Sequence, residues 1–172
     1  MSKRRATLIR IEPKSKLSSD DWRELGSMMQ CLQSQERKWL DDIEEKQQRA
    51  RGVFTLCFIP VPQPLKEIKR LFRTDDILIL ARDLTNLELV GFCAVERKPQ
   101  LGWASCDGIY VKPEWRKRGI ASAFLEMALE KIKKDGLDSL DLRVSVKNKP
   151  AQDLYRKLGF SRTAYMLEKW VA

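Results

Sequence analysis

Residues 109–121 combine the residue types and the spacing that suit a site for a phosphate-bearing anion. An apolar stretch of strand character leads through a basic turn into an amphipathic helix, and the pattern Arg116-x-x-Gly119-x-Ala121 falls where that helix begins. The start of a helix has free backbone N–H groups and the positive end of the helix dipole, so it attracts anions. The small residues Gly119 and Ala121 would let a pyrophosphate approach the backbone. The turn carries four basic side chains, Lys112, Arg116, Lys117 and Arg118.

A second group of residues lies about one helix and one strand downstream. Tyr155 carries a phenol, which can donate a hydrogen bond or a proton. A lone tyrosine in a short helix is more often a packing residue, and a Gly-Phe pair is an ordinary helix stop followed by a core aromatic. The spacing is Val146-x-Asn148-x-x-Ala151-x-x-Leu154-Tyr155-x-x-Leu158-Gly159-Phe160.

The chain of 172 residues contains no histidine, which excludes several classes of catalytic site. Ser–His and Cys–His nucleophiles need an imidazole. Zinc sites with histidine ligands are excluded too, and four scattered cysteines make a poor Cys₄ site. The sequence also lacks the G-x-x-x-x-G-K-[ST] phosphate loop. We therefore expect no metal site and no nucleotide-hydrolysing P-loop.

The formal net charge of +9 indicates a surface that attracts anions. Nucleic acid, an acidic protein and a phosphorylated cofactor all fit this charge, and so does a merely solvated basic surface. No RNA-binding motif accompanies it, so a nucleic-acid partner rests on charge alone.

The cysteines and the hydropathy favour a soluble, cytoplasmic protein without disulfides. No pair among Cys31, Cys57, Cys93 and Cys106 has C-x-x-C spacing, and we expect reduced core thiols. No apolar run approaches the roughly 20 residues of a membrane span. The basic N-terminus, Met1 to Arg5, is not followed by the apolar segment of a secretion signal.

Hydrophobic periodicity predicts an α/β fold in which helices cover both faces of a mixed sheet. A Ser18-x-x-Asp21 capping pattern marks the first helix, and Ile120, Phe124, Ala128 and Ile132 form one apolar helix stripe. The expected strands are residues 6–11, 53–59, 76–81, 87–95, 103–111, 140–146 and 160–170. The expected helices are residues 18–51, 64–72, 119–134 and 150–158.

The two constellations together resemble the acetyltransferases of the GNAT superfamily. Residues 109–121 are similar to its acetyl-CoA motif, [RQ]-x-x-G-x-[GA], after a strand that ends V-x-P. Residues 146–160 are similar to its N-x-x-A-x-x-L-Y-x-x-x-G-F motif. The resemblance is firm over residues 76–165, and residues 33–59 are longer than the family minimum. It implies a single acetyltransferase domain over residues 1–172, in which a splay between two strands holds the cofactor.

The resemblance also implies a role for each matching residue. The backbone of Ile109, Tyr110 and Val111 would pair with the pantetheine arm, and Asn148 would contact that arm. Tyr155 matches the general acid, and a phenol of pKa ~10 can protonate a departing thiolate whose conjugate acid has a pKa of ~8.5. The pyrophosphate would be held by the N–H groups of Arg116, Lys117, Arg118, Gly119, Ile120 and Ala121.

The base that deprotonates the acceptor is less clear from the sequence. Family members often carry a glutamate on the strand before the cofactor motif, and the aligned position here holds Ser105. Asp107 lies two residues on, and strand alternation puts Ser105, Asp107 and Ile109 on one face. Asp107 is our candidate base. Water relays are an alternative, and Asp107 beside Gly108 could instead shape a β-bulge.

The resulting hypothesis is an N-acetyltransferase in which a primary amine attacks acetyl-CoA directly, without a covalent enzyme intermediate. A protein N-terminus or lysine, a small amine and an aminoacyl-tRNA are open as acceptors. The chain is expected to act as a monomer or homodimer. The alternative hypothesis is a module of the same fold that binds protein or nucleic acid without catalysis.

Overall fold

The computed structural model describes residues 7–37, 66, 68–69 and 77–164. The chain divides into two compact units, residues 1–32 with 60–143 and residues 33–59 with 144–172. The basic turn of residues 112–119 belongs to the first unit, and Tyr155 belongs to the second. The prediction of a single domain stays a prediction.

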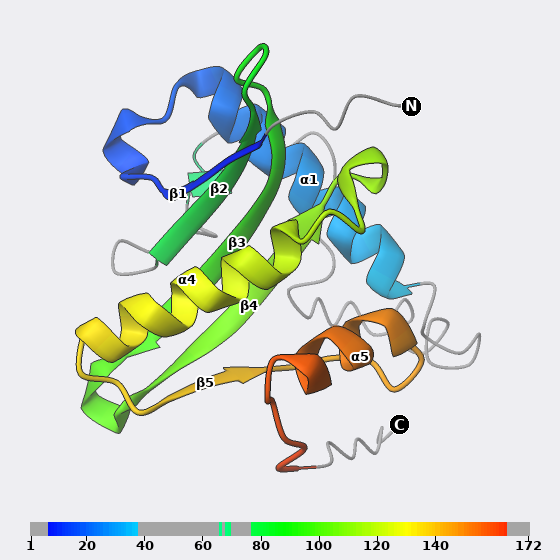
Figure 1. The fold of residues 1–172 in the computed structure, drawn as a ribbon. Coiled ribbons are helices and arrows are strands. Elements are labelled where there is room, and N and C mark those ends of the chain that lie inside the picture. The colour runs from blue at the N-terminus through cyan, green and yellow to red at the C-terminus, as the bar shows by residue number, and fades with distance from the viewer. Residues whose placement is uncertain (1–6, 38–65, 67, 70–76, 165–172) are drawn as a thin grey trace, which may run out of the picture. The chain divides into compact units, whose positions relative to one another are not determined.

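Within the described residues, five strands form one mixed sheet in the order β1-β2-β3-β4-β5 (Figure 1). Neighbouring strands from β1 to β4 are antiparallel, whereas β4 and β5 are parallel. The strand bounds are β1 Thr7–Ile11, β2 Ile77–Asp83, β3 Leu89–Lys98, β4 Trp103–Val111 and β5 Ser139–Leu142. The predicted mixed sheet is confirmed, and β4 has the predicted bounds.

Helices α1 and α4 pack on opposite faces of this sheet (Figure 1). A Cβ added at Gly91 would meet Phe124 of α4, whereas one added at Gly108 would meet Met29 and Leu32 of α1. The helices are α1 Ser19–Arg37, α4 Ile120–Lys134 and, in the second unit, α5 Lys149–Lys157. The described part of the chain also forms the short 3₁₀ turns η1 Lys14–Lys16, η2 Pro99–Leu101 and η3 Pro113–Trp115.

The interior strand β2 is covered on both faces. Residues 77–81 are all buried, which explains why their sequence is continuously apolar instead of alternating. The stripe predicted for α4 is also confirmed, because Ile120, Phe124, Ala128 and Ile132 are all buried. α4 ends as predicted at Gly136, which has a φ of +75°. There the N–H of Leu137 bonds to the carbonyl of Ile132, the pattern of a Schellman motif.

The start of α1 is fixed by the predicted capping box. The Ser18 hydroxyl accepts from the N–H of Asp21 at 3.1 Å, and the Asp21 carboxylate accepts from the N–H of Ser18 at 2.9 Å. Each side chain satisfies one backbone donor that the helix leaves free.

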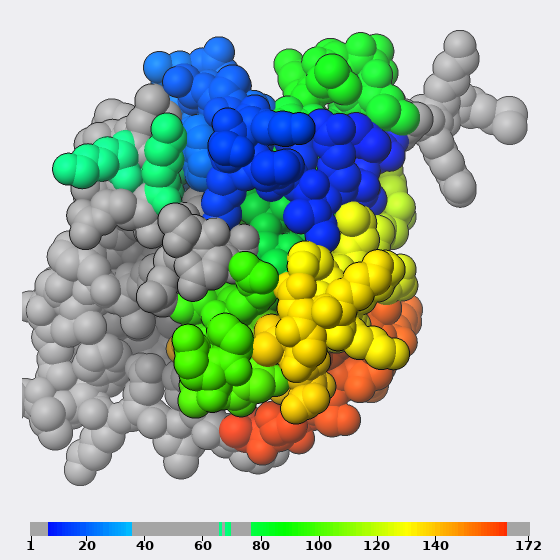
Figure 2. Space-filling model, turned by 90° about the vertical axis from the view of Figure 1, so that its left-hand side faces the viewer, coloured from blue at the N-terminus to red at the C-terminus, as the bar shows by residue number. Residues whose placement is uncertain are grey.

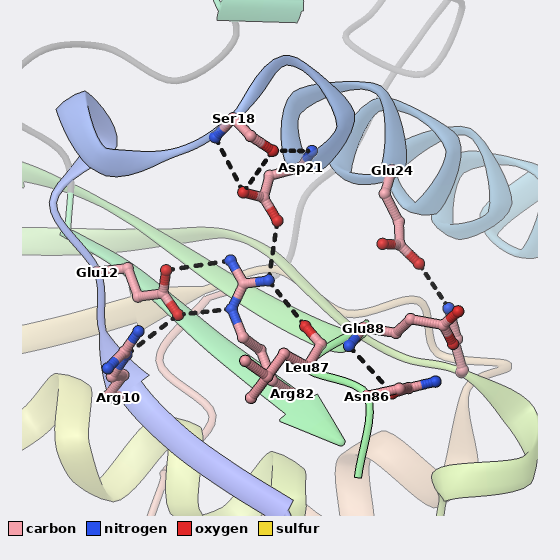
Figure 3. A network of polar contacts seen from close by, with 10 residues as sticks. Arg10, Glu12, Ser18, Asp21, Glu24, Arg82, Asn86, Leu87 and Glu88 are labelled. Atoms are coloured by element: carbon pink, nitrogen blue, oxygen red, sulfur yellow. Dashed lines mark hydrogen bonds and ion pairs between the residues drawn. The ribbon is translucent and has the colours of Figure 1, made fainter. Parts of the chain in front are cut away.

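Arg82 on β2 connects the first turn of α1 to the end of β1 (Figure 3). Its guanidinium donates to both carboxylate oxygens of Glu12, at 2.8 and 3.1 Å, and to Asp21 at 2.8 Å. A further bond at 3.0 Å reaches the carbonyl of Leu87, and Arg10 adds a second cation to Glu12. The Glu12 side chain is 6% exposed, so this is a largely buried ion-pair network.

The network lowers the pKa values of both carboxyl groups. Burial by itself raises the pKa of Glu12, but the hydrogen bonds and charge of Arg82, and then of Arg10, lower it further than burial raises it. The pKa of Asp21 is lowered in the same way, by Arg82 and by the bonds from Ser18. The carboxylates in turn raise the pKa of Arg82. All three groups are therefore held in their charged forms.

The turn between β2 and β3 lies at the surface beside the N-terminal residues (Figure 2, green beside blue at the top). The predicted turn at Asn86 is confirmed, and its side chain accepts from the N–H of Glu88. The Asp83 side chain likewise accepts from Thr85. Because these bonds organise residues 83–88, β2 runs two residues further than predicted and β3 starts two residues later.

Other sequence predictions fail or fall outside the described residues. The strand predicted for 140–146 ends at Leu142, and Val146 is highly exposed, so its alternating pattern is not that of a continuous half-buried strand. Residues 160–164 form no strand. Cys31 is exposed, so the core-thiol prediction is wrong there; Cys93 is buried and free, and Cys106 is half-buried and free. The strand at 53–59, the helix beyond residue 37, most of the helix at 64–72, the strand beyond residue 164 and Cys57 lie outside the described residues.

Replacing Arg82 with methionine should lower the free energy of unfolding by about 3–5 kcal/mol, because it leaves buried carboxylates without their main partner. The control Arg156→Met removes an exposed arginine that pairs with Asp153. That change should cost at most about 1 kcal/mol. Urea unfolding at neutral pH measures both.

The same network predicts a pH dependence of stability. The pKa values of Glu12 and Asp21 in the folded chain lie below their ordinary values of 4.5 and 3.8. The stability that the lowered pKa values contribute is therefore present above the ordinary values and is lost as pH falls through the lowered ones. The advantage of the wild type over Arg82→Met should shrink as unfolding is measured at decreasing pH below about 4.5. An advantage that stays constant into the acid range would contradict this account.

Candidate functional site

The turn between β4 and α4 has a conformation that brings backbone N–H groups to the surface. Lys117 and Gly119 both have positive φ values, +58° and +82°. The first regular bond of α4 joins the N–H of Ala123 to the carbonyl of Gly119, so the N–H groups of the first turn have no partner within the helix. A Cβ added at Gly119 would meet nothing within 4 Å. The described chain therefore leaves open space beside these donors, as a bound anion requires.

Two arginines of the turn also stabilise its conformation through hydrogen bonds to backbone carbonyls. The Arg116 Nε donates to the carbonyl of Val111 at 2.9 Å, and its guanidinium lies 5.7 Å from the centre of the Tyr110 ring. The Arg118 Nη2 donates to the carbonyl of Glu114 at 2.8 Å, and its guanidinium lies over the Trp115 ring. Both side chains remain exposed, so their charge still faces solvent.

Lys112 contributes less positive charge than the sequence suggests. Its ammonium group forms an ion pair with Glu24 of α1, with an N–O distance of 2.7 Å. Both side chains are about a third exposed. The pair joins α1 to the end of β4, and sequence spacing gives no sign of it because 88 residues separate the partners.

β4 contains one extra residue within its pairing with β3. Cys106 is opposite Val95, and Gly108 is opposite the adjacent residue Ala94, so Asp107 has no partner in β3. Two residues of one strand thus oppose one of the other, which is a β-bulge. The bulge that the sequence offered as an alternative for Asp107 is confirmed.

The bulge reverses the alternation of side chains along β4 and corrects one prediction. Ser105 and Gly108 face α1, because their partners in β3 are two residues apart. Ile109 follows Gly108 and therefore faces α4. The prediction that Ser105, Asp107 and Ile109 share a face is wrong for Ile109, since period-two counting fails across an inserted residue.

Beyond the bulge, the outer edge of β4 faces away from the sheet. The N–H of Lys112 donates to the carbonyl of Val90 at 2.9 Å, which fixes the hydrogen-bonding phase of the antiparallel pair. By alternation, the backbone groups of Tyr110 face β3, whereas those of Ile109 and Val111 point away from it. The carbonyl of Val111 accepts from Arg116, and no hydrogen bond joins the other outward groups to the described part of the chain.

The parallel strand β5 leaves this edge open. Its pairing with β4 ends where Leu142 lies opposite Cys106, directly before the bulge. Within the described residues of the first unit, no strand pairs with residues 107–111 on this side. The pairing therefore ends before the residues of β4 that are predicted to bind the cofactor arm, and the splay stays a prediction.

Ser105 and Asp107 meet on the α1 face. The Ser105 hydroxyl donates to the Asp107 carboxylate at 2.8 Å, and Asp107 is exposed. Sequence reasoning missed Glu96, which lies directly opposite Ser105 in β3 and so shares its face. Glu96 is within 3.4 Å of Lys98. Counting the β3–β4 hairpin outward from its turn would have found this glutamate.

In the second unit, the motif residues organise α5. The Asn148 side chain accepts from the N–H of Ala151 at 3.2 Å and so caps the helix. Tyr155 is buried, and its ring centre lies 5.9 Å from that of Phe160. The N–H of Phe160 bonds to the carbonyl of Tyr155, which completes a Schellman motif around Gly159. The N-x-x-A and Y-x-x-x-G-F spacings therefore have a local structural basis.

Two negative findings hold for the described part of the chain. It contains no cluster of three or more His, Cys, Asp or Glu residues that could hold a metal ion. Its helices include none with the length and apolar character needed to cross a membrane.

Comparison with known proteins places these features in a family. Residues 41–160 match the sequence model of the acetyltransferase (GNAT) family. An uncharacterized N-acetyltransferase of Methanocaldococcus jannaschii is 36% identical over 84 residues, which cover 40% of this chain and 37% of that protein. A mycothiol acetyltransferase of Clavibacter michiganensis subsp. michiganensis is 38% identical over 88 residues, which cover 51% of this chain and 28% of that protein. The matches thus span less than two-fifths of either relative.

The fold also matches a solved structure. The ribosomal-protein-S18-alanine N-acetyltransferase of Escherichia coli aligns over 92% of this chain and 80% of its own, with a TM-score of 0.60 and 18% sequence identity. This similarity supports the same mixed sheet flanked by helices.

The cap on α5 can be tested separately from any activity. Asn148→Ala should weaken α5 by about 1 kcal/mol, because the Ala151 N–H loses its acceptor. Asn148→Asp keeps a cap oxygen and should retain the stability of the wild type. Hydrogen exchange at the Ala151 amide measures the difference. Equal exchange in the two variants would show that the cap contributes nothing.

Proposed function

This chain belongs to the acetyltransferase (GNAT) family, and we propose that it transfers an acetyl group from acetyl-CoA to a primary amine. The observation that carries the proposal is the continuity of two binding features. The open edge of β4 at Ile109 and Val111 leads through the turn of residues 112–118 to the N-terminus of α4 at Gly119. An extended arm that ends in a pyrophosphate needs such a continuous edge and anion site.

The chain's residues fit coenzyme A in their donors and in their free space. The outward backbone groups of Ile109 and Val111 would pair with the pantetheine arm as an added strand does. The backbone groups of Tyr110 face β3, so Tyr110 itself would not pair with the pantetheine arm. The pyrophosphate would bind the N–H groups from Lys117 to Ala121, where Gly119 leaves room and Lys117 adds exposed charge. The sequence prediction also included the N–H of Arg116, which instead donates to the carbonyl of Pro113 at 3.2 Å.

Acetyl-CoA would supply an activated acyl group on a thiol leaving group. In our proposal, Tyr155 gives its phenolic proton to the departing sulfur, a transfer favoured by the similar pKa values of phenol and thiol. Asn148 would contact the pantetheine arm through its amide while its oxygen caps α5. Both roles rest on the motif at residues 146–160.

The amine must lose a proton before it attacks. A lysine side chain has a pKa of ~10.4 and an α-amine one of ~8, so the first needs more help. We propose Asp107 as the base, because it is exposed at the bulge and accepts from Ser105. Glu96 shares that face and is the next candidate, and a water relay is the third.

The names of the similar proteins mention compounds as different as mycothiol and a ribosomal-protein alanine. The acceptor of this chain is therefore best identified by experiment. The protein would be incubated with acetyl-CoA and cell extract, and acetylated products would be sought by mass spectrometry. The Gly119→Glu variant, which should not bind acetyl-CoA, measures the acetylation that does not depend on this protein.

Coenzyme A should raise the thermal midpoint of the protein by mass action. Gly119→Glu should abolish this shift, because a side chain and a negative charge would meet the pyrophosphate. Gly136→Glu is the matched control: Gly136 lies at the other end of α4, also has a positive φ and also has open space around its Cβ position. Both variants should lose about 1–2 kcal/mol of stability from the left-handed conformation. Only Gly119→Glu should lose the response. Equal responses in the two variants would refute the anion site.

Asp107→Asn should lower kcat by about 10²–10⁴-fold at neutral pH, since it keeps the hydrogen bond of Ser105 but loses the base. Its thermal response to coenzyme A should be unchanged. Glu96→Gln removes a charge from the same face and should retain activity. Rates over a range of pH test both variants. If Glu96→Gln lowers kcat and Asp107→Asn does not, Glu96 is the base. If neither variant changes the pH profile, a water relay deprotonates the amine.

A further inference from the structure

Two thiols lie next to each other where β4 stops pairing with β5. The sulfur atoms of Cys93 on β3 and Cys106 on β4 are 3.7 Å apart. Cys93 is fully buried, whereas Cys106 is half-buried. Both side chains lie on the α4 face, since Cys93 is opposite Ile109 in the sheet register. Neither thiol has a role in the proposed acetyl transfer.

The position of the pair is set by the bulge. Cys106 is opposite Val95, two residues from Cys93, so the pair is diagonal across the two strands. A diagonal pair in a regular ladder is separated by about 7–8 Å between backbone positions, beyond the usual range for a disulfide. Because the extra residue at Asp107 locally distorts the ladder, the two sulfur atoms come into contact. The Cys106 thiol also lies 4.0 Å from the carbonyl of Gly108, across the bulge.

We propose that Cys93 and Cys106 form an oxidation site, at which a peroxide converts the two thiols into a disulfide across the bulge. The sulfur atoms would close from contact distance to about 2.05 Å. Twelve residues separate the two cysteines, so the bond would close a short loop formed by the β3–β4 hairpin.

The chemistry balances in two steps. The Cys106 thiolate attacks one peroxide oxygen, the O–O bond breaks, and a sulfenic acid forms with release of water or an alcohol. The Cys93 sulfur then attacks the sulfenic sulfur, the S–S bond forms, and water leaves with the Cys93 proton. The two thiols lose two electrons and the peroxide gains them.

The different exposure of the thiols sets this order. Cys106 is the partly exposed residue of the pair, so we expect it to meet the peroxide first. The hydrogen bond with Cys106 and complete burial raise the pKa of Cys93, so Cys93 stays a thiol until its neighbour is oxidised. In a reducing compartment the two thiols would stay reduced, and the disulfide would form only under oxidative conditions.

The bond would act on the open edge of β4. Oxidation removes the Cys106 S–H from the Gly108 carbonyl and draws the bulge toward β3. The outward backbone groups of Ile109 lie three residues beyond Cys106, so their position depends on the bulge. The expected consequence is weaker binding of coenzyme A in the oxidised chain, and this consequence alone rests on the proposed function.

The test uses the full chain with Cys31→Ser and Cys57→Ser, which leaves only the two thiols of interest. Hydrogen peroxide should give a peptide pair joined through Cys93 and Cys106, with the loss of two hydrogen atoms by mass spectrometry. Dithiothreitol should reverse it. The thermal midpoint should rise on oxidation by roughly 5–15 °C, as expected for a short cross-linked loop. Adding Cys106→Ser should abolish the bond and the shift, and Cys93→Ala provides a second variant if the first folds poorly.

The outcomes separate this proposal from the proposed function. Oxidation that stops at sulfinic acid on Cys106, or that links two chains, would overturn the disulfide. A disulfide that forms while the oxidised and reduced chains respond equally to coenzyme A would overturn its effect on the β4 edge. If the reduced chain gives no response to coenzyme A at all, the proposed function fails, and the mass measurement still decides the oxidation site.

Discussion

The extra residue in β4 is the constraint on which the candidate site depends. Before Asp107, β4 is an interior strand with β3 on one side and β5 on the other. After it, β4 keeps β3 but has lost β5, and the backbone groups of Ile109 and Val111 face outward. One inserted residue thus converts the end of an interior strand into an edge that can pair with a ligand. The same distortion brings Ser105 to Asp107 and Cys93 to Cys106.

The turn between β4 and α4 must keep its backbone N–H groups exposed and still hold a defined conformation. Positive φ values at Lys117 and Gly119 turn the chain into α4, and the guanidinium groups of Arg116 and Arg118 hold it by bonding to backbone carbonyls. These arginines satisfy acceptors that the turn would otherwise leave free, and their charges still face solvent. The buried network around Arg82 lies at the same end of the sheet, where α1 starts, because Ala81 is opposite Gly91 and Gly91 is opposite Val111. Rigid elements on both faces therefore hold the β4 edge in place.

Local patterns in the sequence were sufficient for much of the fold. The Ser18–Asp21 capping box, the α4 stripe, the stop at Gly136 and the exact bounds of β4 are confirmed, since each depends on residues a few positions apart. Prediction failed where an inserted residue or a distant partner decides the outcome. Residues 143–146 alternate in polarity but form no strand, and Asp107 interrupts the period-two count along β4. The Lys112–Glu24 pair joins residues too far apart for any local pattern.

The sequence by itself determined the family of this chain and the chemical types at its motifs, because both are properties of ordered residue identities. It also limited the chemistry, because a chain without histidine cannot use an imidazole nucleophile system. The tertiary structure alone decided which face each β4 side chain occupies and which backbone groups are open. It alone brought Cys93 next to Cys106 across the bulge. The physical reason is that strand register and bulge position arise from pairing between segments, and the residues of one segment do not encode where its partner stops.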